Sequence, residues 1–370
     1  MVLLLAAGGL WAGWWRLIGQ FREHTENAQV AGNRLTVMPQ VSGTVTTVRV
    51  DDTDRVHRGD VLLQLDDADA RVAVANAEAA LAEAVRAVSM LVAERSRAAA
   101  AVELATARLA RATADLERRR GLVVRRSISV EELNHAELDV STERAGMQVA
   151  QRQLGVAQSA LGSGPLREHP LVHQAAAALR KAYLDLERCR ILAPADGQVA
   201  QRSVQVGQQV TPASRLLDVV PLEGVWVEVN FKENQLANLR IGQPVHMATD
   251  LYGERLAFTG RIAGIGAGTG SVFSLLPPQN ATGNWIKIVQ RVPVRVDIDR
   301  ESLAGHPLPL GASVDALVDT RARDGMLVTS RAAPVDARFA TDVYADRLGV
   351  IEARLAQRIA AAFSGAGLGD

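Results

Sequence analysis

The fold is indicated by the stretch at residues 37–66, VMPQVSGTVTTVRVDDTDRVHRGDVLLQLD, because the chain contains a similar stretch a second time. Residues 191–220 read ILAPADGQVAQRSVQVGQQVTPASRLLDVV. Each stretch has a Gly-x-Val start, a central valine and a hydrophobic ending, and short apolar runs between turn residues are typical of β strands. With a shift of 154 positions, the equivalent pairs are Gly43 and Gly197, Val45 and Val199, Val56 and Val210, and Leu62 and Leu216. The repeat predicts two related β motifs separated by more than a hundred residues.

The segment after the first motif reads as one long helix. It contains no proline or glycine between Asp69 and Arg120 and is rich in alanine, the residue with the best helix propensity. Its apolar residues follow an alternating four-three spacing, which indicates a coiled-coil seam. The seam positions are Leu81, Val85, Val88, Val92, Ala99, Val102, Leu109 and Leu116, and Arg95, Thr106 and Thr113 interrupt them.

The return segment has a cleaner heptad pattern. Leu133, Val140, Met147, Leu154 and Leu161 recur every seven residues, with Ala136, Ala150 and Ala157 between them and Glu143 as a misfit. The stretch GSGPLREHP, residues 162–170, interrupts this arm before a helical pattern resumes. The outgoing arm of about 52 residues would reach about 78 Å, and the return pieces add up to a similar length. We therefore expect an antiparallel helical hairpin over residues 67–190, inserted between two halves, 21–66 and 191–221, of one small β domain.

The N-terminal residues 1–20 are predicted to form a membrane anchor. MVLLLAAGGLWAGWW is apolar without a break, and the span reaches about 18 residues if Arg16 extends toward the headgroups. Trp11, Trp14 and Trp15 would form an aromatic belt at its end. A cleaved signal peptide is the alternative, but it would need a basic start and a small-x-small cleavage site, and neither is present.

Residues 222–320 have the pattern of a small antiparallel β-barrel. VWVEVNF, VPVRVDI and SVDALV alternate with a period of two residues and are separated by glycine and proline turns. The tail, 321–370, carries an amphipathic run through Tyr344, Leu348, Ile351, Leu355 and Ile359. We expect this run to pack on the body of the protein, with contact to a membrane surface as the alternative.

The sequence offers no site for catalysis, a cofactor or a metal, so we expect a protein that is not an enzyme. The 41 basic and 41 acidic residues balance, which gives no reason to expect nucleic acid. GIGAGTG, residues 264–270, lacks the Gly-x-Gly-x-x-Gly spacing of a phosphate loop. His169 and His173 are four apart, but Pro170 lies between them and no third ligand follows beyond Glu168. Cys189 is the single cysteine, so no internal disulfide forms.

The two β motifs resemble the halves of a lipoyl/biotinyl-type flattened β-sandwich. A cofactor-carrying domain of that type needs a lysine at the turn that joins its halves, where the cofactor is attached as an amide. The only lysines are Lys181, Lys232 and Lys287, and none lies in either half. A carrier role is therefore excluded on chemistry.

With a hairpin inserted in a split lipoyl-like motif, the chain resembles the periplasmic adaptors, or membrane fusion proteins of the HlyD family, of the EmrA multidrug-efflux type. Three stretches carry the resemblance over residues 20 to 330: TENAQVAGNRLTVMPQVSGTV at 25–45, VWVEVNFKENQLANLRIGQPV at 225–245, and GTGSVFSLLPPQNATGNWIKIVQRVPVRVDID at 268–299.

The resemblance implies an adaptor in the inner membrane with its body in the periplasm. Such an adaptor links an EmrB-like major-facilitator drug/proton antiporter to a TolC-like outer-membrane channel, and it works as a trimer or hexamer. An adaptor of a type I (ABC) protein secretion system is the alternative within the family. A structural coiled-coil envelope protein is the alternative outside it, and that reading leaves the split lipoyl-like motif unexplained.

The predicted turn of the hairpin is RRRGLVVRRSISVEEL, residues 118–133. Ser129 and Glu132 have the spacing of a capping box that opens the return helix. In the adaptor family, the hairpin tip carries an arginine, a leucine four residues later and a serine seven residues after that. Arg118, Leu122 and Ser129 match this spacing, so the resemblance implies that they dock on the channel. The alternative is a capped turn with solvated arginines.

Overall fold

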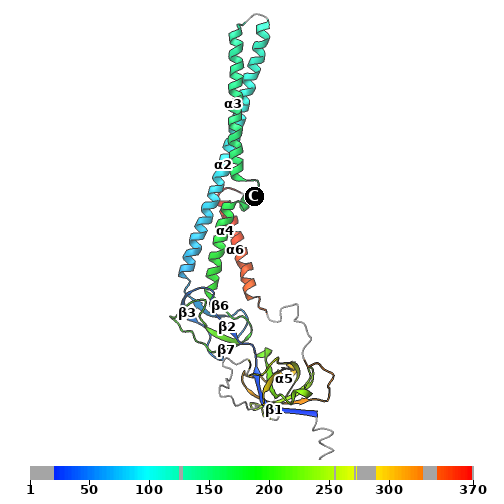
Figure 1. The fold of residues 1–370 in the computed structure, drawn as a ribbon. Helices are drawn as coiled ribbons and strands as arrows, with labels where there is room; N and C mark the ends of the chain where they lie inside the picture. Colours follow the sequence, from blue (N-terminus) through cyan, green and yellow to red (C-terminus); the bar gives the residue numbers. More distant parts are fainter. Residues whose placement is uncertain are drawn as a thin grey trace, which may run out of the picture. The chain divides into compact units, whose positions relative to one another are not determined.

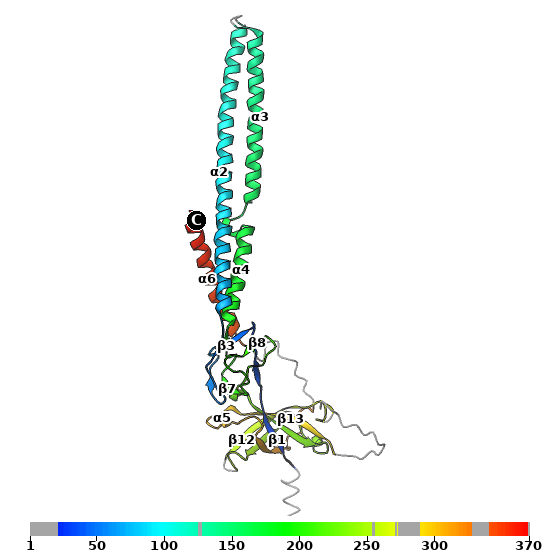
Figure 2. The ribbon, with the colours of Figure 1, turned by 90° about the vertical axis from the view of Figure 1, so that its left-hand side faces the viewer.

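The computed structural model of the protein describes residues 21–124, 128–253, 256–270, 272, 289–327 and 340–368. The chain divides into two compact units (Figures 1 and 2). One comprises Met1–Gln64 with Ile191–Val343 and is built from β strands, and the other comprises Leu65–Arg190 with Tyr344–Asp370 and is helical. The predicted fold class, a mixed α and β protein with an inserted helical hairpin and a small barrel, is confirmed.

The repeated motifs fold together as one lipoyl-like domain. One four-stranded sheet has the order β2 (Leu35–Val37), β9 (Leu217–Val220), β7 (Gly197–Ala200), β4 (Arg55–Val56), and the other has the order β6 (Arg190–Leu192), β5 (Val61–Leu65), β3 (Gly43–Val48), β8 (Gln209–Val210). Each sheet takes strands from both motifs, so neither half completes a sheet alone. The equivalent apolar positions of the repeat are all buried: Val45 and Val199, Val56 and Val210, and Leu62 and Leu216.

The second β domain is a closed antiparallel barrel. Its order is β1 (Arg22–Ala31), β10 (Trp226–Lys232), β13 (Arg291–Ile298), β12 (Ala257–Ile265), β11 (Pro244–Thr249) and β14 (Ser313–Asp319). Alternate residues such as Val227, Val229 and Phe231 fill its interior. The short elements η3 (Leu222–Gly224), η4 (Leu236–Asn238) and α5 (Arg300–Leu303) accompany it.

The prediction that all of residues 21–66 belong to the lipoyl-like domain is wrong for strand β1. It pairs with β10 and β14 as a barrel strand. Its buried residues are Thr25, Ala28 and Val30, and the pairing with β14 shifts register between Thr25 and Ala28. Such an irregularity breaks the period of two that marks a half-buried strand. The local pattern therefore did not indicate the sheet to which the strand belongs.

The helical unit contains the predicted antiparallel hairpin. The outgoing helix α2 (Ala68–Val124) has 57 residues. The return arm is α3 (Val130–Leu161), the short η2 (Leu166–Glu168) and α4 (Pro170–Arg188), with 32 residues in α3 and 19 in α4. Both views show α3 beside the half of α2 nearer the turn and α4 beside its other half (Figures 1 and 2).

The seam of α2 differs from the predicted one where α2 faces α3. Thr106 and Thr113 are exposed, and their hydroxyls donate to the carbonyls of Val102 and Leu109 at 2.8 and 2.7 Å. Leu109 and Leu116 face α3 as predicted, but the seam positions that alternate with them lie one residue earlier, since Ala98 is buried and Ala112 packs with Leu109 and Leu116. Leu81, Val85 and Val88 pack with α4 residues, so the buried stripe shifts where α2 exchanges one partner for the other. On α3 the predicted alanines, Ala136, Ala150 and Ala157, are buried.

The tail folds back as expected. Helix α6 (Val343–Gly365) places Ile351, Leu355 and Phe363 in one apolar cluster with residues of α2 and α4. Arg180 of α4 and Glu352 of α6 form an ion pair at 2.6 Å. The predicted anchor, residues 1–20 with Trp11, Trp14 and Trp15, lies outside the described residues. No helix in the described part of the chain combines the length and the apolar character needed to cross a membrane.

Candidate functional site: the tip of the helical hairpin

Arg118 and Leu122 lie in the last turns of α2, four residues apart and therefore on one face of the helix. The Leu122 side chain is 40% exposed although it is apolar. The Arg118 side chain is 74% exposed, and its ion pair at 2.9 Å is with Asp115 of the same helix. These two predicted docking residues thus form an accessible pair of a cation and an apolar group.

Ser129 begins the return arm with the predicted capping box. Its backbone is extended (φ −76°, ψ 155°), and its Oγ accepts the N–H of Glu132 at 3.2 Å. The Glu132 carboxylate accepts the N–H of Ser129 at 3.1 Å in return. A hydroxyl that accepts one hydrogen bond keeps its O–H for a second partner. Ser129 is exposed, so its role as a cap is compatible with a contact to another protein.

Two further arginines, which the sequence did not single out, tie the two arms together. Arg119 donates to the carbonyl of Glu132 at 3.3 Å. Arg120 pairs with Glu117 of its own helix at 2.9 Å and with Glu137 of α3 at 3.3 Å. The acidic residues around this arginine run were the available sequence signal for ion pairs, but they do not show which arginine crosses to the other arm. Arg119 and Arg120 have structural contacts between the arms, whereas Arg118 has none among the described residues.

Val130, the first residue of α3, is a second apolar group at the tip. Its side chain is 66% exposed. The sequence signal for this exposed side chain was its position directly after the cap and off the heptad seam. The tip therefore presents two apolar side chains beside an arginine and a hydroxyl, a combination suited to binding a protein surface.

The described residues offer no comparable arrangement for chemistry. Among them, no group of three or more His, Cys, Asp and Glu side chains is placed to hold a metal ion. His169 caps α4, where its Nδ1 accepts the N–H of Leu171 at 3.3 Å. Burial, reinforced by the charges of Asp67 and Asp185, raises the pKa of the Cys189 thiol, so this buried cysteine stays protonated at neutral pH.

The hairpin matches a known family model, the EMRA alpha-helical hairpin domain, over residues 68–189. The chain is 43% identical over 332 residues to the multidrug export protein EmrA of Escherichia coli K12, and the match covers 89% of this chain and 85% of that protein. The chain belongs to the EmrA family of membrane fusion proteins. The fatty acid resistance protein FarA of Neisseria gonorrhoeae is 48% identical over 299 residues, and the match covers 80% of this chain and 76% of FarA. A solved structure of the periplasmic adaptor protein EmrA aligns with 81% of this chain and 99% of its own at 18% identity, with a TM-score of 0.41.

Proposed function

We propose that this EmrA-family protein is the periplasmic adaptor of a tripartite multidrug efflux pump. Residues 1–20, with Trp11, Trp14 and Trp15 as an aromatic belt, anchor it in the inner membrane, and the body lies in the periplasm. It links an EmrB-like major-facilitator drug/proton antiporter to a TolC-like outer-membrane channel. The names of the relatives as multidrug export proteins support the export role. The accessible apolar tip of the hairpin supports the link to a channel.

The exposed Leu122 carries this proposal. It sits at the end of a helix that is about 86 Å long at 1.5 Å per residue. The cross-arm contacts of Arg119 and Arg120 join the ends of the two arms near Leu122. Burying one leucine contributes roughly 1.5–3 kcal/mol. In a trimer or hexamer, which we propose as the working form, the same contact is repeated in every subunit.

The three tip residues have different weights in the proposed interface. Leu122 fills an apolar pocket at its centre, while Arg118 and Ser129 hydrogen-bond at its rim. Polar rim contacts contribute less than a desolvated centre. Arg118 is available for a carboxylate of the channel, because its bond to Asp115 is an exposed pair within one helix and such pairs are weak.

The test is Leu122→Asp, assayed by drug susceptibility and by crosslinking to the outer-membrane channel. We expect loss of both crosslinking and resistance, with the fold and the binding to the transporter unchanged. Leu104→Asp is the matched control, because Leu104 is also an exposed leucine of α2 but lies away from the tip. Arg118→Glu and Ser129→Asp should have smaller effects, and aspartate still caps the helix at position 129. Normal crosslinking and resistance in Leu122→Asp would mean that the tip is only a capped turn and does not dock on the channel.

The transporter partner is testable separately from the tip. A neighbouring gene for a 14-helix carrier supports the major-facilitator antiporter. A neighbouring gene for an ABC ATPase would instead favour the type I secretion adaptor, and copurification of the encoded transporter with the chain would decide between them.

A further inference from the structure

Two cations face each other at the ends of two barrel strands. Lys232, the last residue of β10, lies directly opposite Arg291, the first residue of β13. Directly opposed side chains of an antiparallel pair lie on the same face, and like charges there are destabilising. Within the described part of the chain, neither cation is ion-paired with a carboxylate, and Arg291 donates only to the backbone carbonyl of Asn230, at 3.3 Å.

A third cation on the same strands, Arg295, is neutralised by an ion pair. Arg295 lies opposite Glu228 and forms an ion pair with Asp297 at 2.9 Å. Its guanidinium also stacks on the Trp226 ring, 4.0 Å from the ring centre. On the outer face of β10 and β13, Arg295 is therefore neutralised, whereas Lys232 and Arg291 have no ion-paired carboxylate among the described residues.

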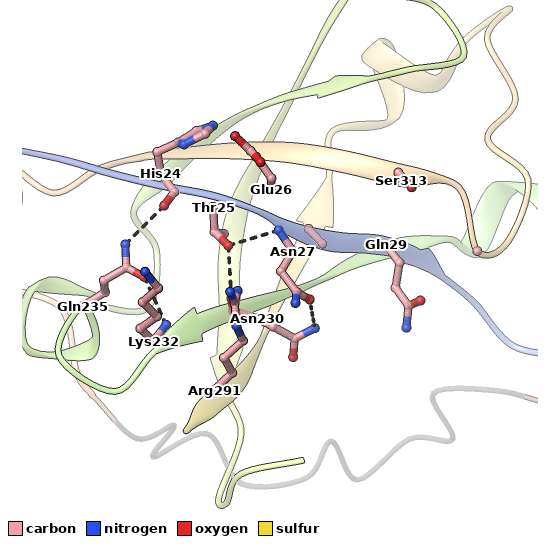
Figure 3. Close-up of a pocket in the computed structure, with 12 residues that line it drawn as sticks. His24, Thr25, Glu26, Asn27, Gln29, Asn230, Lys232, Gln235, Arg291 and Ser313 are labelled. Atoms are coloured by element: carbon pink, nitrogen blue, oxygen red, sulfur yellow. Dashed lines mark hydrogen bonds between the residues drawn. The ribbon is translucent and has the colours of Figure 1, made fainter. Parts of the chain in front are cut away.

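The Lys232–Arg291 pair lines a cavity of about 680 Å³ beside strand β1 (Figure 3). Polar side chains make up much of the rest of its lining, among them Asn27, Asn230 and Gln235. The Asn230 amide donates to the Asn27 side-chain oxygen at 3.1 Å, and the Asn27 N–H donates to the Thr25 hydroxyl at 3.2 Å. The register shift of β1 lies between Thr25 and Ala28, and bulges are frequent beside binding sites. These bonds hold the amides in place around the cavity.

One carboxylate, Glu26, lines the cavity together with the two cations, so the charged side chains of the lining leave a net positive charge. Glu23 is not part of the lining, and both of its oxygens accept amide hydrogens, from Gln235 and Asn238, at 2.9 Å each. Figure 3 shows Glu26 beside His24 on one side of β1, with Lys232 and Arg291 on the other side. In the sequence, residues 255–296 contain five arginines and lysines and no aspartate or glutamate.

We propose that this cavity is an oxyanion site, in which Lys232 and Arg291 together bind a carboxylate, phosphate or sulfate group. Both residues form charge-assisted hydrogen bonds to such a group, and a guanidinium offers two parallel donors. The ligand is either a soluble organic anion or the headgroup of an anionic phospholipid. The headgroup is within reach because β1 starts directly after the predicted anchor, and four extended residues span about 14 Å. This site goes beyond the adaptor role and does not depend on the hairpin tip.

The small number of lysines makes the site directly observable. The chain has only Lys181, Lys232 and Lys287, so reductive ¹³C-dimethylation gives three lysine side-chain signals, and methylation keeps their charge. The full-length chain in neutral detergent is titrated with inorganic phosphate and with octanoate. We expect a saturable shift of the Lys232 signal and none for Lys181, whose ammonium pairs with Asp185 at 2.8 Å. Arg291→Gln should weaken the affinity about tenfold, the loss expected for one charged hydrogen bond.

Arg261→Gln is the matched control, because Arg261 is an exposed arginine of β12 that does not line the cavity. It should leave the titration unchanged. In nanodiscs, a Lys232 shift with phosphatidylglycerol but not with phosphatidylcholine assigns the headgroup, whereas a shift with phosphate or octanoate in detergent together with no shift in phosphatidylglycerol nanodiscs assigns a soluble anion. Parallel, non-saturating shifts of Lys181 and Lys232, no response in any arm, or an unchanged affinity in Arg291→Gln would each overturn the site.

Discussion

Asp218 is a fully buried carboxylate of the lipoyl-like domain, enclosed between Arg215 and Arg34. Burial alone would raise the pKa of this carboxyl. Hydrogen bonds from Arg215 and Thr36 and the charges of Arg215 and Arg34 outweigh burial, so the pKa of Asp218 lies below its usual value. The ionised form therefore stabilises the native state. This contribution is complete above the pKa of the unfolded chain, about 4, and is lost as the pH falls through the lower native pKa.

We accordingly predict that Asp218→Asn lowers the free energy of unfolding by about 1–3 kcal/mol at pH 7, the cost of a lost buried charged bond. The difference from the natural protein should shrink below about pH 4, because the natural carboxyl then becomes protonated as well. Urea unfolding followed by far-UV circular dichroism at pH 7 and pH 3 measures both values. Asp315→Asn, an exposed position of β14, is the control and should change little. A difference that grows toward low pH would contradict the assignment.

Among the helices, the stability of the part of the hairpin in which α2 packs on α3 depends on the observed seam of α2. Leu116 is buried against Ala136 and Val140 of α3, whereas Leu104 of the same helix is exposed. Leu116→Ala should cost about 2–4 kcal/mol through lost burial and the cavity it leaves. Leu104→Ala should cost less than about 0.5 kcal/mol. Hydrogen exchange of α3 reports the difference, and equal protection in the two variants would disprove the seam.

Helix α6 completes the apolar core at the other end of the hairpin. Ile351 is fully buried with Leu81 of α2 and Leu179 of α4, while its neighbour Val350 is exposed. We expect Ile351→Asp to detach α6 and to speed hydrogen exchange in α4, because burying an unpaired charge in this cluster costs several kcal/mol. Val350→Asp should leave α4 protected. Unchanged exchange in Ile351→Asp would mean that α4 is stable without α6.

For the whole molecule, the proposed topology predicts export of everything from Phe21 onward. Protease added to spheroplasts should digest the body, while the same protein in intact cells stays protected by the outer membrane. The uncut protein should fractionate with the inner membrane through residues 1–20. Complete protection in spheroplasts would contradict the periplasmic location and, with it, the adaptor role.

The sequence was sufficient to predict the features that depend on local periodicity and local hydrogen bonds. The repeated valines and leucines, Val45 with Val199 and Leu62 with Leu216, are buried because each motif repeats the same alternation of strand residues. The Ser129 cap and the heptads of α3 follow from spacings of three, four and seven residues, which the helix geometry fixes. Family membership was also readable, since it rests on similar residues in similar order.

Which surfaces meet could be seen only in the three-dimensional structure. It assigned β1 to the barrel, because a bulge hides the alternation of that strand and its partners β10 and β14 lie about 200 residues or more away. It kept Leu109 and Leu116 in the seam of α2 and replaced the predicted position at Thr113 with Ala112, because a helix that changes partners presents a different stripe to each. It gave Arg119 and Arg120 the cross-arm contacts and left Arg118 exposed, and it placed Lys232 opposite Arg291. The reason is the same in each case: a local pattern shows that a face seeks a partner, and the choice of partner depends on contacts between segments that are distant in sequence.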